Sequence, residues 1–209
     1  MYQLDAALTA WINSPAGQAP TLDAIMLGAS TIGVPVLVLA VALQWWTFAS
    51  TQFPRESAWR FSRGNRSHFP WNCSRADSAV RHVVVAAGLS FLLGLGINQI
   101  ILLFFQRVRP YDAHVTHLII DRTVDFSFPS DHSTASFAIA AVFLIYGLWG
   151  RGLLFLAAAL LISLSRIYLG THYVSDVLGG AATGFLAAAL VRWAYRQGTG
   201  VDRLITGLL

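Results

Sequence analysis

Long apolar stretches separated by polar segments dominate the hydrophobic pattern of this chain. We assign five membrane spans, at about residues 21–48, 79–105, 132–149, 153–165 and 172–195, with a turn at 150–152 between the third and the fourth. A helix needs about 20 apolar residues to cross a bilayer, and these stretches are the chain's candidates for that role. The pattern therefore predicts an all-α fold, a polytopic transmembrane helical bundle of about five spans.

A shorter apolar stretch precedes the first span. Leu4, Leu8 and Trp11 recur at helical spacing within residues 3–13, which are too few to cross a bilayer that takes about 20. We expect an interfacial helix that lies on the membrane with Trp11 at headgroup level. The alternative is a helix that packs against the end of the bundle.

Composition supports a membrane protein and suggests its orientation. Hydrophobic residues make up 56% of the chain and charged residues 11%, and the net charge of +4 comes from arginines in short polar segments. This distribution indicates that the positive charge sets the membrane topology and meets anionic lipid headgroups, and that it does not bind nucleic acid.

The arginine-rich loop 50–78 is expected in the cytoplasm, where the positive-inside rule also places the C-terminus. The loop 106–131 and the turn 166–172 then fall on the extracytoplasmic side. That side keeps four arginines, which are Arg107, Arg109, Arg122 and Arg166. Arginines on the disfavoured side suggest another role. We therefore expect a multi-pass protein of the plasma (inner) membrane with its functional residues outside.

The segment from Arg166 to Asp176 carries the first candidate chemistry. If a helix starts at Thr171, His172 and Asp176 lie four apart on one face, where the carboxylate can accept a proton from one imidazole nitrogen. The other nitrogen is then free to act as a nucleophile or base. Arg166 precedes the turn and can hold an anion, most naturally a phosphate.

Two further segments are expected at the same end of the bundle. Ser130, Asp131 and His132 open the span that begins near residue 132, and backbone N–H groups at a helix N-terminus favour an anion. Arg107 and Arg109 lie in the preceding loop. Cationic forks, amides, a hydroxyl and histidines together suit phosphoryl transfer.

The sequence offers no cluster of carboxylates for a pair of metal ions, so we expect metal-independent catalysis without a cofactor. His114 and His117 are three apart, but a third ligand for a metal ion is not evident. They are interpreted as solvated loop residues.

These motifs resemble the signature of the type 2 phosphatidic acid phosphatase superfamily, which also includes the vanadium haloperoxidases. The resemblance covers about residues 79–195 and rests on Arg109-Pro110, Pro129-Ser130-Asp131-His132, and Ser165-Arg166 with His172 and Asp176. It implies roles that agree with the residue chemistry. His172 would be the nucleophile that forms a phosphohistidine, Asp176 would orient it, His132 would be the acid, and Arg109, Ser130 and Arg166 would bind phosphate.

Two positions depart from the family pattern. Leu102 stands where the family usually has a lysine, and Arg107 is either its substitute as a phosphate ligand or a rim arginine that meets lipid headgroups. Asp131 replaces a frequent glycine, and its carboxylate repels phosphate unless it pairs with an arginine or takes a proton. The Pro-Ser-Asp-His form and the Asn98-Gln99 pair resemble the bacterial undecaprenyl-diphosphate phosphatase branch.

The resemblance implies a single membrane-embedded phosphatase domain over residues 1–209, with its motifs in 79–195. Its substrate would be a polyprenyl (undecaprenyl) diphosphate, hydrolysed at the terminal phosphate during recycling of the carrier for cell wall biogenesis. The alternatives are a phosphatidylglycerophosphate or phosphatidic acid phosphatase and, from another class, a lipid-binding or transport module without catalysis. A haloperoxidase is disfavoured because those relatives are largely soluble. The expected partners are the lipid and the bilayer; the sequence identifies no protein partner.

Overall fold

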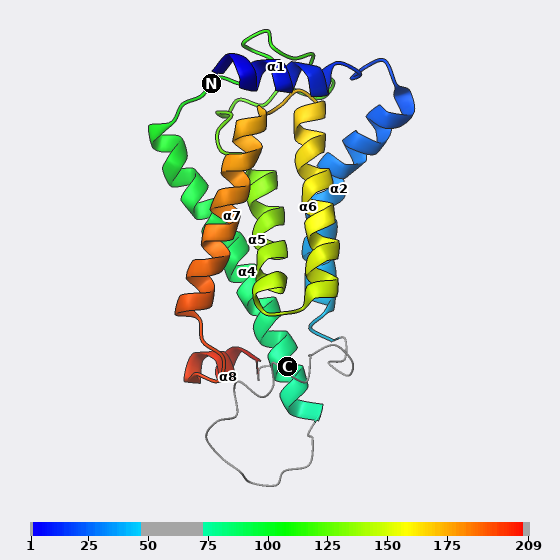
Figure 1. The fold of residues 1–209 in the computed structure, drawn as a ribbon. Helices are drawn as coiled ribbons and strands as arrows, with labels where there is room; N and C mark the ends of the chain where they lie inside the picture. Colours follow the sequence, from blue (N-terminus) through cyan, green and yellow to red (C-terminus); the bar gives the residue numbers. More distant parts are fainter. Residues whose placement is uncertain (1, 47–72, 207–209) are drawn as a thin grey trace.

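The computed structural model describes residues 2–46 and 73–206, and the regular structure in these ranges is helical. The helices are α1 (Tyr2–Asn13), α2 (Pro20–Leu43), α4 (Cys73–Phe104), α5 (Asp131–Ile145), α6 (Trp149–Tyr168), α7 (Val174–Ala194) and α8 (Gly200–Thr206). Figure 1 shows α2, α4, α5, α6 and α7 running up and down as a bundle, with α1 across one end and α8 at the other. The predicted all-α bundle is confirmed.

Four helices in the described ranges are long and apolar enough to cross a membrane: Pro20–Leu43, Ala79–Phe104, Trp149–Tyr168 and Val174–Ala194. They correspond to four of the expected spans, and they make the chain a multi-pass membrane protein. The expected turn at residues 150–152 is wrong, because these residues lie in the first turn of α6, and α2 ends at Leu43, earlier than expected.

The remaining expected span, 132–149, is shorter than predicted. α5 has 15 residues, because the helix ends at Ile145 and the chain turns at Gly147 with a φ of 76°. At about 1.5 Å per residue it extends about 22 Å. Every residue from 133 to 143 is buried, and α5 packs mainly against α4, α6 and α7. Since α5 faces protein, the lipid thickness does not fix its length.

The contact between α5 and α7 is the most extensive in the bundle and depends on two glycines. A Cβ at Gly180 would lie 2.5 Å from the carbonyl oxygen of Ser130, and one at Gly184 would lie 2.7 Å from that of Thr134. Glycines four apart let membrane helices approach this closely. The packing fixes the N-terminal turn of α5 against α7 and thereby brings two of the predicted motifs together.

Helix α1 presents two different sides. The exposed side carries the large side chains Tyr2, Leu4, Leu8 and Trp11. On the other side Thr9 and Asn13 are buried, and the Asn13 amide donates to the carbonyl oxygens of His117 (2.9 Å) and Tyr168 (2.7 Å). The helix therefore packs on the end of the bundle, as one alternative expected. It also exposes an apolar face, which the other alternative, an interfacial helix, requires. Its location on the membrane surface stays a prediction.

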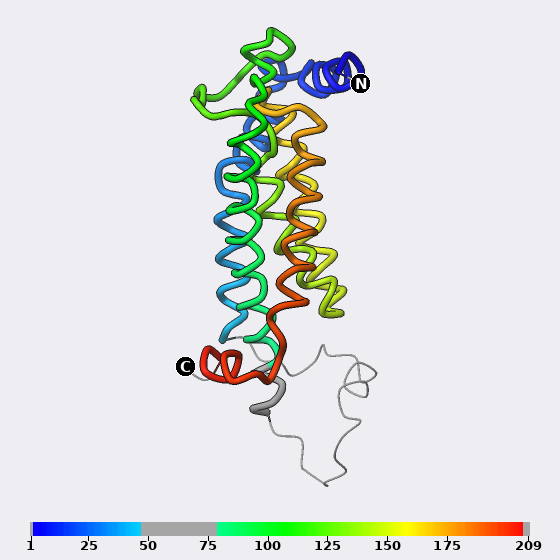
Figure 2. The backbone as a smooth tube through the Cα atoms, turned by 90° about the vertical axis from the view of Figure 1, so that its left-hand side faces the viewer, coloured from blue at the N-terminus to red at the C-terminus, as the bar shows by residue number. Residues whose placement is uncertain are grey.

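The two ends of the bundle differ in what they carry. Figures 1 and 2 show the connection between α4 and α5 and the turn between α6 and α7 at the end that α1 crosses, and α8 at the opposite end. This agrees with the expected grouping of the loop 106–131 with the turn 166–172. Most of the arginine-rich loop 50–78 lies outside the described residues, and its expected cytoplasmic position is a prediction.

Candidate active site

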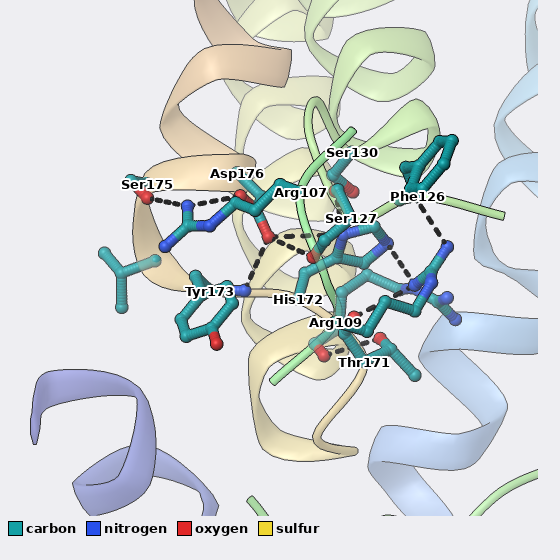
Figure 3. Close-up of polar contacts among 12 residues, drawn as sticks. Arg107, Arg109, Phe126, Ser127, Ser130, Thr171, His172, Tyr173, Ser175 and Asp176 are labelled. Carbon is teal, nitrogen blue, oxygen red and sulfur yellow. Dashed lines mark hydrogen bonds and ion pairs between the residues drawn. The ribbon is translucent and has the colours of Figure 1, made fainter. Parts of the chain in front are cut away.

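Residues from all three predicted motifs meet at the end of the bundle that α1 crosses (Figures 1 and 3). Arg109 lies in the loop after α4, and Ser130 is the residue that precedes the first turn of α5. Arg166 is in the last turn of α6, His172 is in the turn that follows, and Asp176 is in the first turn of α7. Helix ends at one side of the bundle thus supply the candidate nucleophile and the cations.

The orientation of His172 is set by a backbone carbonyl. Its ring is buried, with 3% of the residue exposed, and Nδ1 donates to the carbonyl oxygen of Ser127 at 2.8 Å. A carbonyl can only accept, so the proton is on Nδ1 and the lone pair is on Nε2. The expected partner, Asp176, lies farther away, with its Oδ2 3.8 Å from Nδ1.

The expected helical start at Thr171 is wrong, because α7 begins at Val174. His172 therefore precedes the helix, and the predicted four-residue spacing on one helix face does not apply. The turn directs the imidazole towards the loop before α5. The Asp176 carboxylate lies on the Nδ1 side of the ring, farther away than the Ser127 carbonyl.

Three donors compensate the buried charge of Asp176. The Ser127 hydroxyl and the Tyr173 backbone N–H, the latter at 2.8 Å, donate to Oδ2, and Arg107 donates to Oδ1 at 2.7 Å. Asp176 is fully buried, so these partners are needed to hold a carboxylate there. Ser127 consequently touches both members of the pair, His172 with its carbonyl and Asp176 with its hydroxyl.

All five donor positions of the Arg109 guanidinium have protein partners. Nη1 donates to the Thr171 carbonyl oxygen at 2.9 Å and lies 3.3 Å from Nε2 of His172. Nε donates to the Asp125 carbonyl oxygen at 3.0 Å, and Nη2 donates to the Asp125 carboxylate at 2.8 Å and to the Phe126 carbonyl oxygen at 3.4 Å. An incoming anion would have to replace some of these contacts.

Arg166 and Ser130, by contrast, keep unused donors. Nη1 of Arg166 donates to the Ser30 hydroxyl at 2.5 Å, whereas its Nε is buried and has no hydrogen-bond partner within the described part of the chain. The Ser130 hydroxyl is likewise buried and unpaired there. The first helical hydrogen bond of α5 runs from the Thr134 N–H to the Ser130 carbonyl, so the N–H groups of 131–133 have no partner within the helix. Such donors suit an anion.

Among the described residues, Asp131 pairs with an amide and not with an arginine. Its Oδ1 accepts from the Asn98 amide at 2.7 Å, and the same amide nitrogen donates to the Thr134 hydroxyl at 2.8 Å. Asn98 is fully buried in α4. The amide side chain therefore links α4 to the first turn of α5, and the place of Asp131 among the substrate-binding residues stays a prediction.

Arg107 contacts carboxylates. Its Nη1 donates to Asp176 at 2.7 Å and to the Ser175 hydroxyl at 2.6 Å, and its Nη2 donates to Asp5 at 2.7 Å. The guanidinium also lies over the Tyr173 ring, 3.8 Å from its centroid. Its expected role as a substitute for the missing lysine is untested by these contacts. In this structure the Arg107 guanidinium is a hydrogen-bond donor that holds the Asp176 carboxylate in place.

His132 is in the first turn of α5 and is half-buried. Its ring is within electrostatic reach of Arg166, His172 and Arg109. The predicted acid therefore shares one charged environment with the predicted nucleophile and phosphate ligands. Histidines and carboxylates of the described residues form no group of three or more that could hold a metal ion.

The surroundings shift the protonation of two groups in the loops. Burial lowers the pKa of His172, and the charges of Arg166 and Arg109 lower it further, although Asp176 opposes the shift. The imidazole therefore stays neutral to lower pH than an ordinary histidine does. Burial alone would raise the pKa of Asp125, but the charge of Arg109 and the hydrogen bonds from Thr123 and Arg109 together outweigh it, and the pKa lies below the ordinary value.

Sequence reasoning missed Ser127, Asp125 and Asp5 as members of the site. Ser127 and Asp125 lie in the loop 106–131, where no regular spacing identifies them. Asp5 offered a signal, because Asp5, Thr9 and Asn13 recur every four residues along α1 and form its inward side. A polar stripe on an otherwise apolar helix predicts docking on polar groups.

The fold and the site together define a multi-pass membrane protein with a buried centre of histidine and arginine side chains. The chain belongs to the PAP2 superfamily, which matches residues 83–199, more than half of the sequence. The resemblance seen in the motifs is thereby confirmed.

Several curated proteins are similar over this region. Undecaprenyl-diphosphatase BcrC of Bacillus subtilis (strain 168) is 36% identical over 110 residues, 53% of this chain and 56% of that protein. The putative undecaprenyl-diphosphatase YbjG of Escherichia coli (strain K12) is 30% identical over 118 residues, 56% of this chain and 60% of that protein. Phosphatidylglycerophosphatase B of Bacillus subtilis (strain 168) is 35% identical over 119 residues, 50% of this chain and 56% of that protein. The matches thus span little more than half of each relative.

A solved structure supports the fold along nearly the whole chain. It is the crystal structure of a transmembrane PAP2 type phosphatidylglycerolphosphate phosphatase from Bacillus subtilis, with a TM-score of 0.57 and 22% sequence identity. The similarity covers 95% of this chain and 89% of that one.

Proposed function

We propose that this protein is an integral membrane lipid phosphatase that acts through a phosphohistidine on His172. The observation that carries the proposal is the arrangement around one nitrogen. Nε2 of His172 carries the lone pair, and Nη1 of Arg109 lies 3.3 Å from it. The charge of Arg166 acts on the same imidazole, and Arg166 and Ser130 each keep a buried donor without a partner in the described part of the chain. A neutral nucleophile surrounded by anion-binding donors suits attack on a phosphate.

The proposed reaction has two displacements at phosphorus. In the first, Nε2 of His172 forms a bond to the terminal phosphorus while the bond from phosphorus to the bridging oxygen breaks. Protonated His132 gives its proton to the departing lipid monophosphate. Arg109, Arg166 and Ser130 hold the equatorial oxygens, and the N–H groups of the first turn of α5 add to this binding.

In the second displacement, water attacks the phosphohistidine and the N–P bond breaks. Neutral His132 takes the proton from water, so inorganic phosphate leaves and both histidines return to their starting state. Asp176 stabilises the positive charge that His172 carries in the intermediate, helped by Ser127 as the acceptor at Nδ1. This scheme requires no metal ion, in line with the sequence expectation.

We favour undecaprenyl diphosphate as the substrate because BcrC and YbjG carry that activity in their names and share up to 36% identity with this chain. The competing substrate is phosphatidylglycerophosphate, which the name of another relative at 35% identity suggests. Phosphatidic acid would serve the same chemistry. We further propose that the lipid enters sideways from the outer leaflet of the plasma membrane and that the C-terminus is cytoplasmic, as the arginine distribution indicates.

The test is a comparison of the purified wild-type protein with the His172→Ala variant. Phosphate release is measured with undecaprenyl diphosphate, phosphatidylglycerophosphate and phosphatidic acid, each with and without a chelator. We expect the highest kcat/KM with the diphosphate, no effect of the chelator, and an acid-labile phosphoryl group on His172. Undiminished phosphate release by His172→Ala would overturn the mechanism. Lipid binding without turnover by the wild type would favour the transport or binding module.

A further inference from the structure

Helix α1 reaches the site through an acidic residue that none of the phosphatase motifs includes. Asp5 accepts from Nη2 of Arg107 at 2.7 Å, and Nη1 of the same guanidinium donates to Asp176 at 2.7 Å. Asp176 in turn lies 3.8 Å from Nδ1 of His172. We propose that Asp5 is a positioning residue of the phosphatase reaction, which acts through Arg107 on Asp176. The inference rests on the proposed function.

The geometry of Arg107 makes this connection specific. A guanidinium is planar and rigid, so fixing one of its two terminal nitrogens fixes the direction of the other. Asp5 holds Nη2, and the Tyr173 ring covers the face of the guanidinium at 3.8 Å. Nη1 is thereby aimed at Asp176. Without Asp5, the side chain would keep only its contacts on the α7 side.

Asp5 also completes the N-terminus of α7. Its Oδ1 accepts from the Ser175 backbone N–H at 3.0 Å, and its Oδ2 accepts from the Ser175 hydroxyl at 2.5 Å. The first turn of a helix has N–H groups without partners inside the helix, and a carboxylate there is favourable. Asparagine at position 5 would keep a side-chain oxygen that can accept from Ser175, so Asp5→Asn chiefly removes the charge that holds Arg107.

Thr9 offers a matched comparison on the same side of α1. Its hydroxyl accepts from the Val174 N–H at 3.1 Å, so it docks α1 on the same turn of α7. It is fully buried. Thr9 has no contact with Arg107 among the hydrogen bonds of the described residues, and replacing it disturbs docking without touching the proposed connection.

The contacts from Asp5 through Arg107 to Asp176 should affect the chemical step more than substrate binding. Asp176 stabilises the charge that develops on His172, and that charge is absent in the ground state. Loss of Asp5 should therefore lower kcat and leave KM nearly unchanged. Because Asp5 acts through Arg107, its removal should add little once Arg107 has been replaced.

The experiment compares Asp5→Asn, Thr9→Val, Arg107→Gln and the double variant Asp5→Asn/Arg107→Gln with the full-length wild type in one detergent. We expect Asp5→Asn to lower kcat about tenfold, the effect of a lost charged hydrogen bond, with KM within about twofold. Thr9→Val should lower the Tm while kcat changes less than about threefold. The double variant should match Arg107→Gln within about twofold.

Three results would overturn the inference: an unchanged kcat for Asp5→Asn, an equal loss of kcat for Thr9→Val, or multiplying losses in the double variant. A second readout needs no lipid. Diethyl pyrocarbonate acylates neutral imidazole, and mass spectrometry follows its rate at His172. We expect Asp5→Asn, but not Thr9→Val, to change that rate. If the wild type releases no phosphate from any lipid, the proposed function fails, whereas the acylation rates still decide the role of Asp5.

Discussion

Ser127→Ala separates the two contacts that Ser127 makes in the site. The backbone carbonyl that accepts from Nδ1 of His172 is retained in alanine, and only the hydroxyl bond to Asp176 is lost. Ser127 is fully buried, so water does not readily replace the missing donor. The substitution therefore tests whether the hydrogen bond from Ser127 to Asp176 contributes to catalysis, while the tautomer of His172 is preserved.

The expected loss follows from the partners that remain. A hydrogen bond to a charged group contributes about 1.5–3 kcal/mol, and each 1.4 kcal/mol of transition-state stabilisation is about tenfold in rate. Asp176 keeps the Tyr173 N–H at 2.8 Å and Arg107 at 2.7 Å, so we place the effect at the lower limit. We expect kcat to fall about tenfold and KM to change less than about twofold. Steady-state phosphate release from a polyprenyl diphosphate gives both values.

Ser90→Ala is the matched control. Ser90 is equally buried, but its hydroxyl donates to the Ala86 carbonyl oxygen within α4 at 2.7 Å. It should share any general cost of removing a buried hydroxyl, seen as a lower Tm, without the loss of kcat. If Ser127→Ala keeps the wild-type kcat, or if Ser90→Ala loses as much, the contact of Ser127 with Asp176 has no catalytic role.

Three other predictions concern the anion site and the protonation of His172. Asp125→Asn should lower the inhibition constant of inorganic phosphate by up to about fivefold, because the exposed carboxylate, worth up to about 1 kcal/mol, no longer competes for Arg109. An unchanged constant would mean that phosphate does not use Arg109. Ser130→Ala removes a hydroxyl with no partner in the described residues, so vanadate inhibition should weaken about tenfold with little change in Tm; a large fall in Tm would show a structural role. The pKa of His172 is lowered, so protonation, which removes the lone pair of Nε2, should reduce kcat/KM only below about pH 6.5; a pH profile in which loss of the free base begins higher would contradict this.

The apolar pattern predicted the fold well wherever a helix faces lipid. The expected span at 79–105 corresponds to Ala79–Phe104, and that at 172–195 to Val174–Ala194. The third span was wrong at its end because the apolar residues continue through the turn at Gly147 into α6. An apolar run does not by itself show where a buried helix ends and an apolar turn follows it.

The site was predictable where chemistry and position coincide. An up-and-down bundle must bring the segments of Arg109, Ser130, Arg166 and His172 to one end. Figure 3 shows three of these residues together, and Arg166 is in the last turn of α6 at the same end in Figure 1. The contacts of Ser127 depend on the path of an irregular loop, for which the sequence carries no periodic signal. The bond from Asp5 to Arg107 joins residues 102 apart and depends on how α1 docks.

The contrast between the arginines suggests an order of events in the proposed reaction. Arg109 has every donor engaged, including one towards the lone pair of His172, whereas Arg166 and Ser130 keep buried donors unpaired. A terminal phosphate would first meet the unpaired donors and the N-terminus of α5, because no existing hydrogen bond has to break there. Once the phosphate is held, its oxygens can draw Nη1 of Arg109 from Nε2 of His172. The lone pair is then released where the phosphorus lies, so the nucleophile becomes available only when the substrate is in place.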